Sequence, residues 1–162
     1  SIHSNIPAPA GGGISMPGEL LWEGDFFTGQ FTVIDPYGTG DQGWYDPNTG
    51  DSRRPDHNLF HQINIVNIPD PFTQIKDEVY WLDVSVSTVS ESIRWGWKTS
   101  QDHFMDDAVW ADDPTGSITG WQELIDPETG ESLDRTFVIT PEPATLGVLV
   151  IGGLAMLRRR RR

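Results

Sequence analysis

The chain of 162 residues contains no cysteine, so it forms no disulfide and offers neither a thiolate nucleophile nor a cysteine-ligated metal site. It is also poor in cations. Residues 1–140 hold 23 of the 24 Asp and Glu residues but only 6 of the 11 Lys and Arg residues, a net charge of −17. Such an acidic body repels nucleic-acid phosphates and anionic membranes. We therefore expect no nucleic-acid partner, and membrane contact only through the C-terminal tail.

Known catalytic signatures are missing as well. The sequence has no Gly-X-Ser-X-Gly elbow, no His-Glu-X-X-His metal motif and no phosphate-binding loop. With 24 carboxylates in the chain, a glycosidase-like pair such as Asp106 with Glu123 arises by chance. The sequence therefore predicts no enzyme, no cofactor and no metal site.

One long uncharged apolar run lies near the C-terminus, beginning at Ala144 and ending at Leu157. As a helix it would rise about 21 Å, which is short of a bilayer core of roughly 30 Å. The arginines that follow can snorkel to the headgroups and stay cytoplasmic. We predict a single transmembrane helix at 144–157 with an Arg-rich cytoplasmic tail; the alternative is a buried core helix with a basic tail. The arginines are Arg158, Arg159, Arg160, Arg161 and Arg162.

A Pro-Glu-Pro triplet, Pro141, Glu142 and Pro143, precedes this run. Motif, apolar span and basic end together resemble the PEP-CTERM sorting signal of exported bacterial proteins. The resemblance implies recognition by an exosortase, a membrane-embedded transpeptidase-like enzyme that cuts near the motif. It also implies a location at the cell surface or in the extracellular matrix of bacteria that make exopolysaccharide. We therefore divide the chain into an extracellular domain at 1–140 and a sorting signal at 141–162.

The N-terminal residues lack a basic region followed by an apolar one, although an exported protein is expected to have a signal peptide. We therefore expect the chain to be a fragment, with residues 1–4 ending a strand that starts upstream. Segments such as PGELLWEGDF, EVYWLDVSV and WGWKTSQDHFMDDAVW resemble a domain of unknown function carried by many PEP-CTERM proteins. In that family more strands come before the segment that resembles SIHSNIP.

The body shows strand patterns and no convincing helical period. Tyr80, Leu82, Val84 and Val86 recur at every second position and so share a face, and such a two-residue period is typical of half-buried strands. The sequence predicts an all-β fold, an antiparallel β-sandwich or jelly roll, followed by the single C-terminal transmembrane helix. The expected strands lie at residues 20–22, 26–34, 61–68, 79–89, 93–99, 108–110, 121–125 and 136–139.

Related turn sequences recur: DPNTG at 46–50, DPETG at 126–130 and the shorter DPTG at 113–116. Proline presets the second position of a turn, aspartate bonds the backbone ahead of it, and glycine accepts a positive φ. We interpret all three segments as strand connections. Calcium binding is the second interpretation, because one of them has an oxygen spacing that loosely resembles calcium loops. The oxygen donors there are Asp46, Asn48 and Asp51.

The histidines carry no metal signature. His57 and His61 have a spacing that suits a metal on a helix, but on a strand they would stand about 13 Å apart. His103 follows a polar stretch that predicts a loop. We interpret all three as surface or hydrogen-bonded side chains.

Seven tryptophans make the aromatic residues the best ligand candidates. Trp95 and Trp97 fall on one side of the pattern, opposite Arg94, Gly96 and Lys98. We predict that this side packs into the core; a platform for sugar rings, with Tyr80 adjacent, is the alternative. The second candidate pair, expected to be more exposed, is Trp44 and Tyr45.

Taken together, the sequence predicts an exported, surface-associated structural or interaction protein. The alternatives are a carbohydrate-binding module for exopolysaccharide and the C-terminal part of a secreted hydrolase. The first alternative depends on exposed aromatic rings, and the second on catalytic residues outside this chain.

Overall fold

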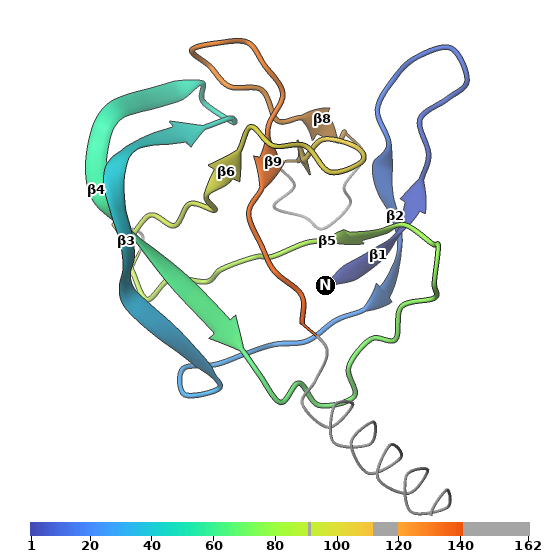
Figure 1. Cartoon of the computed structure of the whole chain (residues 1–162), viewed down its shortest axis with the longest axis horizontal. Helices are drawn as coiled ribbons and strands as arrows, with labels where there is room; N and C mark the ends of the chain where they lie inside the picture. The colour runs from blue at the N-terminus through green and yellow to red at the C-terminus, as the bar shows by residue number, and fades with distance from the viewer. Residues whose placement is uncertain (91, 112–119, 141–162) are drawn as a thin grey trace, which may run out of the picture.

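The computed structural model describes residues 1–90, 92–111 and 120–140. This part of the chain is all-β, its sheets are antiparallel, and it contains no helix, so the prediction of an all-β antiparallel fold is confirmed. Figure 1 shows a long curved hairpin on one side, a three-stranded sheet on the other and short strand pairs between them. The strands are β1 (Ile2–Ile6), β2 (Met16–Trp22), β3 (Phe31–Asp46), β4 (Asp51–Ile65), β5 (Tyr80–Leu82), β6 (Thr99–Ser100), β7 (Val109–Trp110), β8 (Gln122–Glu123) and β9 (Asp134–Arg135).

The three-stranded sheet has the order β2-β1-β5, with β1 at its centre. Ile2 pairs with Trp22 on one side and with Leu82 on the other, and its side chain is buried. The Trp81 indole N–H donates to Asn5 Oδ1 at 2.7 Å, which fastens β5 to β1 through side chains as well as the backbone. This sheet therefore joins chain segments that lie far apart in the sequence.

The hairpin of β3 and β4 pairs from Phe31 with Ile65 at its base to Asp46 with Asp51 at its tip. Its register shifts at several points along the ladder, and such irregularities bend and twist a strand. One of them adjoins Gly38, where the Phe60 ring lies so close that any side chain at position 38 would collide with it. The shifts and the small residue let the hairpin curve around the middle of the molecule (Figure 1).

Both described Asp-Pro-X-Thr-Gly segments are strand connections, as predicted. The Asp46 and Asp126 side chains each accept the N–H two residues on, at 3.0 and 2.8 Å. The N–H groups of Gly50 and Gly130 close each turn onto the carbonyl of its aspartate, at 2.8 and 2.9 Å. Both glycines have φ near +75°, at 75° and 74°, which a side chain would oppose. The third segment, 113–116, lies outside the described residues.

The short pairs β6–β9 and β7–β8 surround a small core. Leu124 donates its N–H to Ala108 O at 2.8 Å, and Leu133 donates to Leu124 O at 2.9 Å. In the part of the chain that the structure describes, the buried apolar side chains are Leu124, Leu133, Ile2 and Pro17. Many other large apolar side chains are exposed, so this core is sparse for a chain of this length.

Several predicted strands are wrong in extent. The strand predicted at 79–89 contracts to β5, and the one at 93–99 contracts to β6. No strand forms at 136–139, while the strands at 26–34 and 61–68 shift into the long hairpin. Alternation predicts an extended backbone, but a strand also needs a neighbour that completes its hydrogen-bond ladder. In 83–89 and 93–98 the described chain forms no such ladder.

Among the described residues, no helix is both long enough and apolar enough to cross a membrane. The predicted transmembrane helix at 144–157, the Pro-Glu-Pro motif before it and the arginines after it lie outside the described residues.

Candidate functional site: an exposed aromatic cluster near the long hairpin

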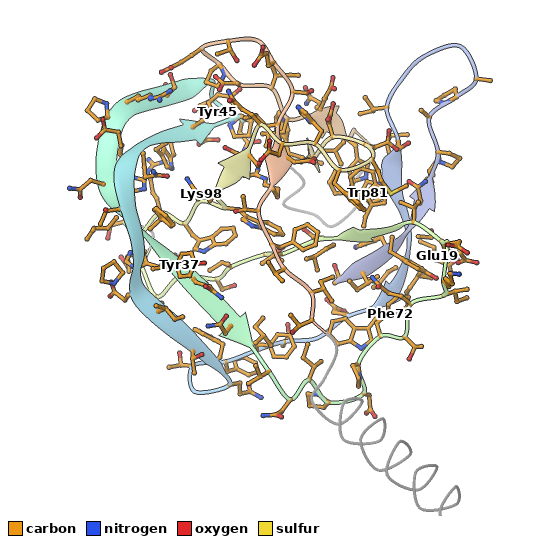
Figure 2. All side chains as sticks on the ribbon, in the orientation of Figure 1. Glu19, Tyr37, Tyr45, Phe72, Trp81 and Lys98 are labelled. Atoms are coloured by element: carbon orange, nitrogen blue, oxygen red, sulfur yellow. The ribbon has the colours of Figure 1, made fainter. Side chains whose placement is uncertain are left out.

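Residues 94–98 run between the hairpin and the C-terminal described segment, and they carry the predicted alternation. The Arg94 guanidinium lies 4.7 Å from the centre of the Trp44 ring. Lys98 Nζ lies 4.8 Å from the centre of the Phe60 ring and donates to Gln42 Oε1 at 2.7 Å. Figure 2 shows Lys98 on the side of its segment that faces the hairpin. Both cations therefore cover aromatic rings of β3 and β4, a favourable cation–π arrangement.

The two tryptophans of this segment contact other rings. The Trp95 and Trp97 ring centres stand 6.3 Å apart with planes tilted by 50°, and the Phe137 ring lies 6.0 Å from Trp97 at 59°. We call Trp95, Trp97 and Phe137 the aromatic cluster. Trp95 is 38% exposed and Phe137 is 56% exposed, while Trp97 is half-buried between them. The prediction that Trp95 and Trp97 form the core is therefore wrong for Trp95 and holds for only part of Trp97.

Hydrogen bonds hold the centre of the aromatic cluster in place. The Trp97 indole N–H donates to Thr136 O at 2.7 Å, and Arg135 Nη1 donates to Trp97 O at 2.8 Å. Thr136 adds a backbone bond to Lys98 O at 3.0 Å. Burial lowers the pKa of Arg135, but an arginine so placed stays charged. Because Trp97 is fixed at both its backbone and its side chain, the cluster presents its rings in a defined arrangement.

The structure separates the second candidate pair. Trp44 and Tyr45 are consecutive in β3, where successive side chains point to opposite faces. Both are half-buried rather than exposed, and they lie in the strand before the turn. Trp44 joins the surroundings of the aromatic cluster through Arg94, whereas Tyr45 does not share that face. Tyr80 packs against Phe72 with ring centres 5.0 Å apart, so it is not part of the cluster.

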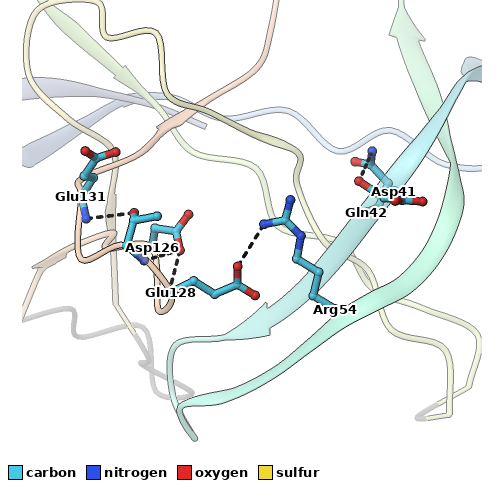
Figure 3. Close-up of polar contacts among 7 residues, drawn as sticks. Asp41, Gln42, Arg54, Asp126, Glu128 and Glu131 are labelled. Carbon is cyan, nitrogen blue, oxygen red and sulfur yellow. Dashed lines mark hydrogen bonds and ion pairs between the residues drawn. The ribbon is translucent and has the colours of Figure 1, made fainter.

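Cations gather on this side of the acidic body. Of the six Lys and Arg residues in 1–140, five belong to the hairpin, the 94–98 segment or β9. Arg54 also reaches from β4 to the second Asp-Pro turn, where its Nη1 lies 3.0 Å from Glu128 Oε2 (Figure 3). Both side chains are exposed, so this pair contributes little to stability. The five residues are Arg53, Arg54, Arg94, Lys98 and Arg135.

A second group of polar side chains lies at the short strand pairs. His103 Nδ1 lies 2.6 Å from Asp107 Oδ1. Burial raises the pKa of Asp107, but hydrogen bonds from Ser132 and His103 and the charge of His103 outweigh it, so the pKa is lowered overall. Burial raises the pKa of Glu123, and its bond to Asp107 raises it further. The carboxyl group that bonds Glu123 is thus that of Asp107, and not that of the neighbouring Asp106.

The strand histidines behave as predicted. His57 lies 2.9 Å from Asp56 and His61 lies 3.0 Å from Asp35, each pairing with its own carboxylate. Both are exposed residues of β4, and no contact brings them together.

The fold and these surfaces define an all-β protein of antiparallel sheets with an exposed aromatic cluster near the long hairpin. The profile of a family described as a domain of unknown function (DUF7901) matches residues 1–140, and the chain belongs to this family. The predicted resemblance of the body to a domain of unknown function is therefore confirmed. No curated protein and no solved structure matches the chain.

Proposed function

We propose that this protein is exported and acts at the cell surface or in the extracellular matrix as an interaction protein. The support is the order of three features at the C-terminus: the Pro141-Glu142-Pro143 motif, the apolar run at 144–157 and the terminal arginines. Through this PEP-CTERM-like signal an exosortase would recognise the chain. The all-β body suits an extracellular domain, and its sheets on opposite sides of the molecule (Figure 1) support a sandwich or jelly-roll architecture.

Expression in a host with a matching exosortase should yield surface protein that has lost its C-terminal tail. Changing Glu142 to alanine is expected to slow this loss, because it alters the motif and leaves the span and the arginines intact. Intact-mass spectrometry of surface material measures the processing, and Glu131→Ala in the body serves as the matched control. Mature surface protein that still ends at Arg162 would rule out the sorting proposal.

We further propose that the aromatic cluster binds exopolysaccharide, and one observation carries this: Trp95 and Phe137 are exposed although they contact a fixed Trp97. Exposed aromatic rings held in a defined arrangement suit the apolar faces of sugar rings. Because the body is strongly acidic, we propose a neutral polymer rather than a polyanion.

Changing Trp95 to alanine should weaken binding to a neutral polysaccharide about tenfold or more, since truncating an aromatic contact residue commonly removes over 1 kcal/mol. Its effect on the free energy of unfolding should be small, because the side chain is already exposed. Affinity gel electrophoresis against a panel that includes dextran and alginate measures the binding.

Phe27→Ala is the control, because Phe27 is 71% exposed and lies outside the aromatic cluster. It should bind like the parent protein. Equal binding by Trp95→Ala and the parent, or binding to alginate alone, would contradict the proposed ligand class.

A further inference from the structure

Three potential metal ligands from two separate chain segments converge beside β9. One ring nitrogen of His103 and one carboxylate oxygen each of Asp107 and Asp134 all lie within 4.8 Å of one another. Among the described residues this is the one group of three or more such side chains at that spacing. We call it the histidine–carboxylate cluster. No sequence pattern predicts that Asp134 lies beside the other two residues.

The backbone around the cluster is anchored on each side. Phe104 donates its N–H to Asp134 Oδ2 at 2.7 Å, which holds the 101–107 loop against β9. Directly after Asp107, Ala108 donates its N–H to Leu133 O at 3.1 Å. Asp134 itself pairs with Ser100 in the β6–β9 ladder. The three ligands are therefore placed by strand pairing as well as by their own side-chain contacts.

The negative charge of the cluster is not balanced by protein cations. Within the residues that the structure describes, no lysine or arginine forms an ion pair with Asp107 or Asp134. The single basic group in contact is the His103 ring, and Glu123 adds a third carboxyl through its bond to Asp107. A divalent cation would offset this excess of acidic groups.

The donor set favours one class of metal. An imidazole nitrogen suits zinc and its neighbours, while calcium and magnesium prefer oxygen ligands alone. Ligand atoms of a tetrahedral zinc site stand roughly 3.3 Å apart, given bond lengths of about 2.0–2.1 Å. The observed spacing reaches up to 4.8 Å, while the His103–Asp107 contact of 2.6 Å is shorter than in such a site. Binding zinc would therefore require the three side chains to rotate and the ion to replace the His103–Asp107 hydrogen bond. Three protein ligands leave the fourth position of such a site open for water.

We propose that His103, Asp107 and Asp134 bind one Zn²⁺ ion, which fastens the 101–107 loop to β9. This site is separate from the aromatic cluster and does not depend on the proposed polysaccharide binding.

The test uses the purified 162-residue chain and ZnCl₂ alone, without any polysaccharide. Isothermal titration calorimetry should show one Zn²⁺ bound per chain, and Zn²⁺ should raise the melting temperature by a few degrees. Asp134→Asn is expected to weaken Zn²⁺ binding roughly 100-fold, more than the loss of an outer-shell partner commonly does. His103→Gln should do the same.

The chain supplies a matched control in His61→Gln, which removes a histidine that also pairs with an aspartate, Asp35 at 3.0 Å. That pair belongs to no three-ligand group, so the control should bind Zn²⁺ like the parent.

NMR of the parent protein provides a readout that does not depend on a variant folding correctly. On addition of Zn²⁺ the imidazole signals of His103 should shift, while those of His57 and His61 stay in place. Shifts at His57 or His61 instead, the absence of any shift, or Ca²⁺ binding as tight as that of Zn²⁺ would each overturn the proposal.

Discussion

Leu124→Ala is expected to destabilise the domain by about 2–5 kcal/mol, the range for truncating a buried leucine. Leu124 is 2% exposed, and its backbone bonds Ala108 on one side and Leu133 on the other. Only three other apolar side chains are buried in the described part, namely Ile2, Pro17 and Leu133. Since a domain of this size has about 5–15 kcal/mol of stability, the loss would be a large share of the total.

Urea denaturation followed by tryptophan fluorescence measures this loss. Val138→Ala is the control, because Val138 is 85% exposed and its truncation should change the free energy of unfolding by about 0.5 kcal/mol or less. Equal stability of the two variants would show that the core does not lie at the short strand pairs.

Trp97→Ala is expected both to destabilise the domain and to abolish polysaccharide binding. Truncating a fully buried tryptophan costs about 3–5 kcal/mol, and since Trp97 is half-buried we expect about 2 kcal/mol. The same change removes the ring that contacts both Trp95 and Phe137, so the aromatic cluster loses its centre. Thermal unfolding and affinity electrophoresis on one preparation measure the two effects.

The conservative change Trp97→Phe separates packing from hydrogen bonding. It keeps a ring in contact with its neighbours and removes the N–H that donates to Thr136 O at 2.7 Å. That carbonyl lies at an exposed residue and can bond water instead, so the loss should be about 1 kcal/mol or less, with binding retained. Loss of binding in this variant would mean that the indole itself contacts the ligand.

The sequence predicted best those features that depend on residues close together in the chain. The Asp46 and Asp126 turns follow from residues that are neighbours in the chain, because each aspartate caps its own turn. The alternation of Arg94 and Lys98 with Trp95 and Trp97 likewise predicted two chemically different sides. The alternation could not show which of the two sides packs against the rest of the protein. That depends on the β3–β4 hairpin, whose aromatic rings contact Arg94 and Lys98.

The long hairpin was underestimated for a physical reason. Prolines and glycines along residues 31–65 indicate turns when they are considered locally, yet both strands continue through them by shifting register. A local sequence pattern also cannot predict which distant segments pair with one another. The meeting of Asp134 with His103 and Asp107 depends on how β6 and β9 pair. Only the His103–Asp107 spacing of four residues was a signal in the sequence.

The strand pairing also predicts the order in which parts of the fold form, because some strands pair with sequence neighbours and others with distant segments. The β3–β4 hairpin closes around one tight turn, so its contacts are local and should form early, whereas β1 must wait for β5. The 94–98 segment can dock on the hairpin only after Trp44 and Phe60 are in place. While the chain is still folding, the edge of β1 that β5 later covers is therefore open to other chains, and the aromatic cluster is among the last features to form.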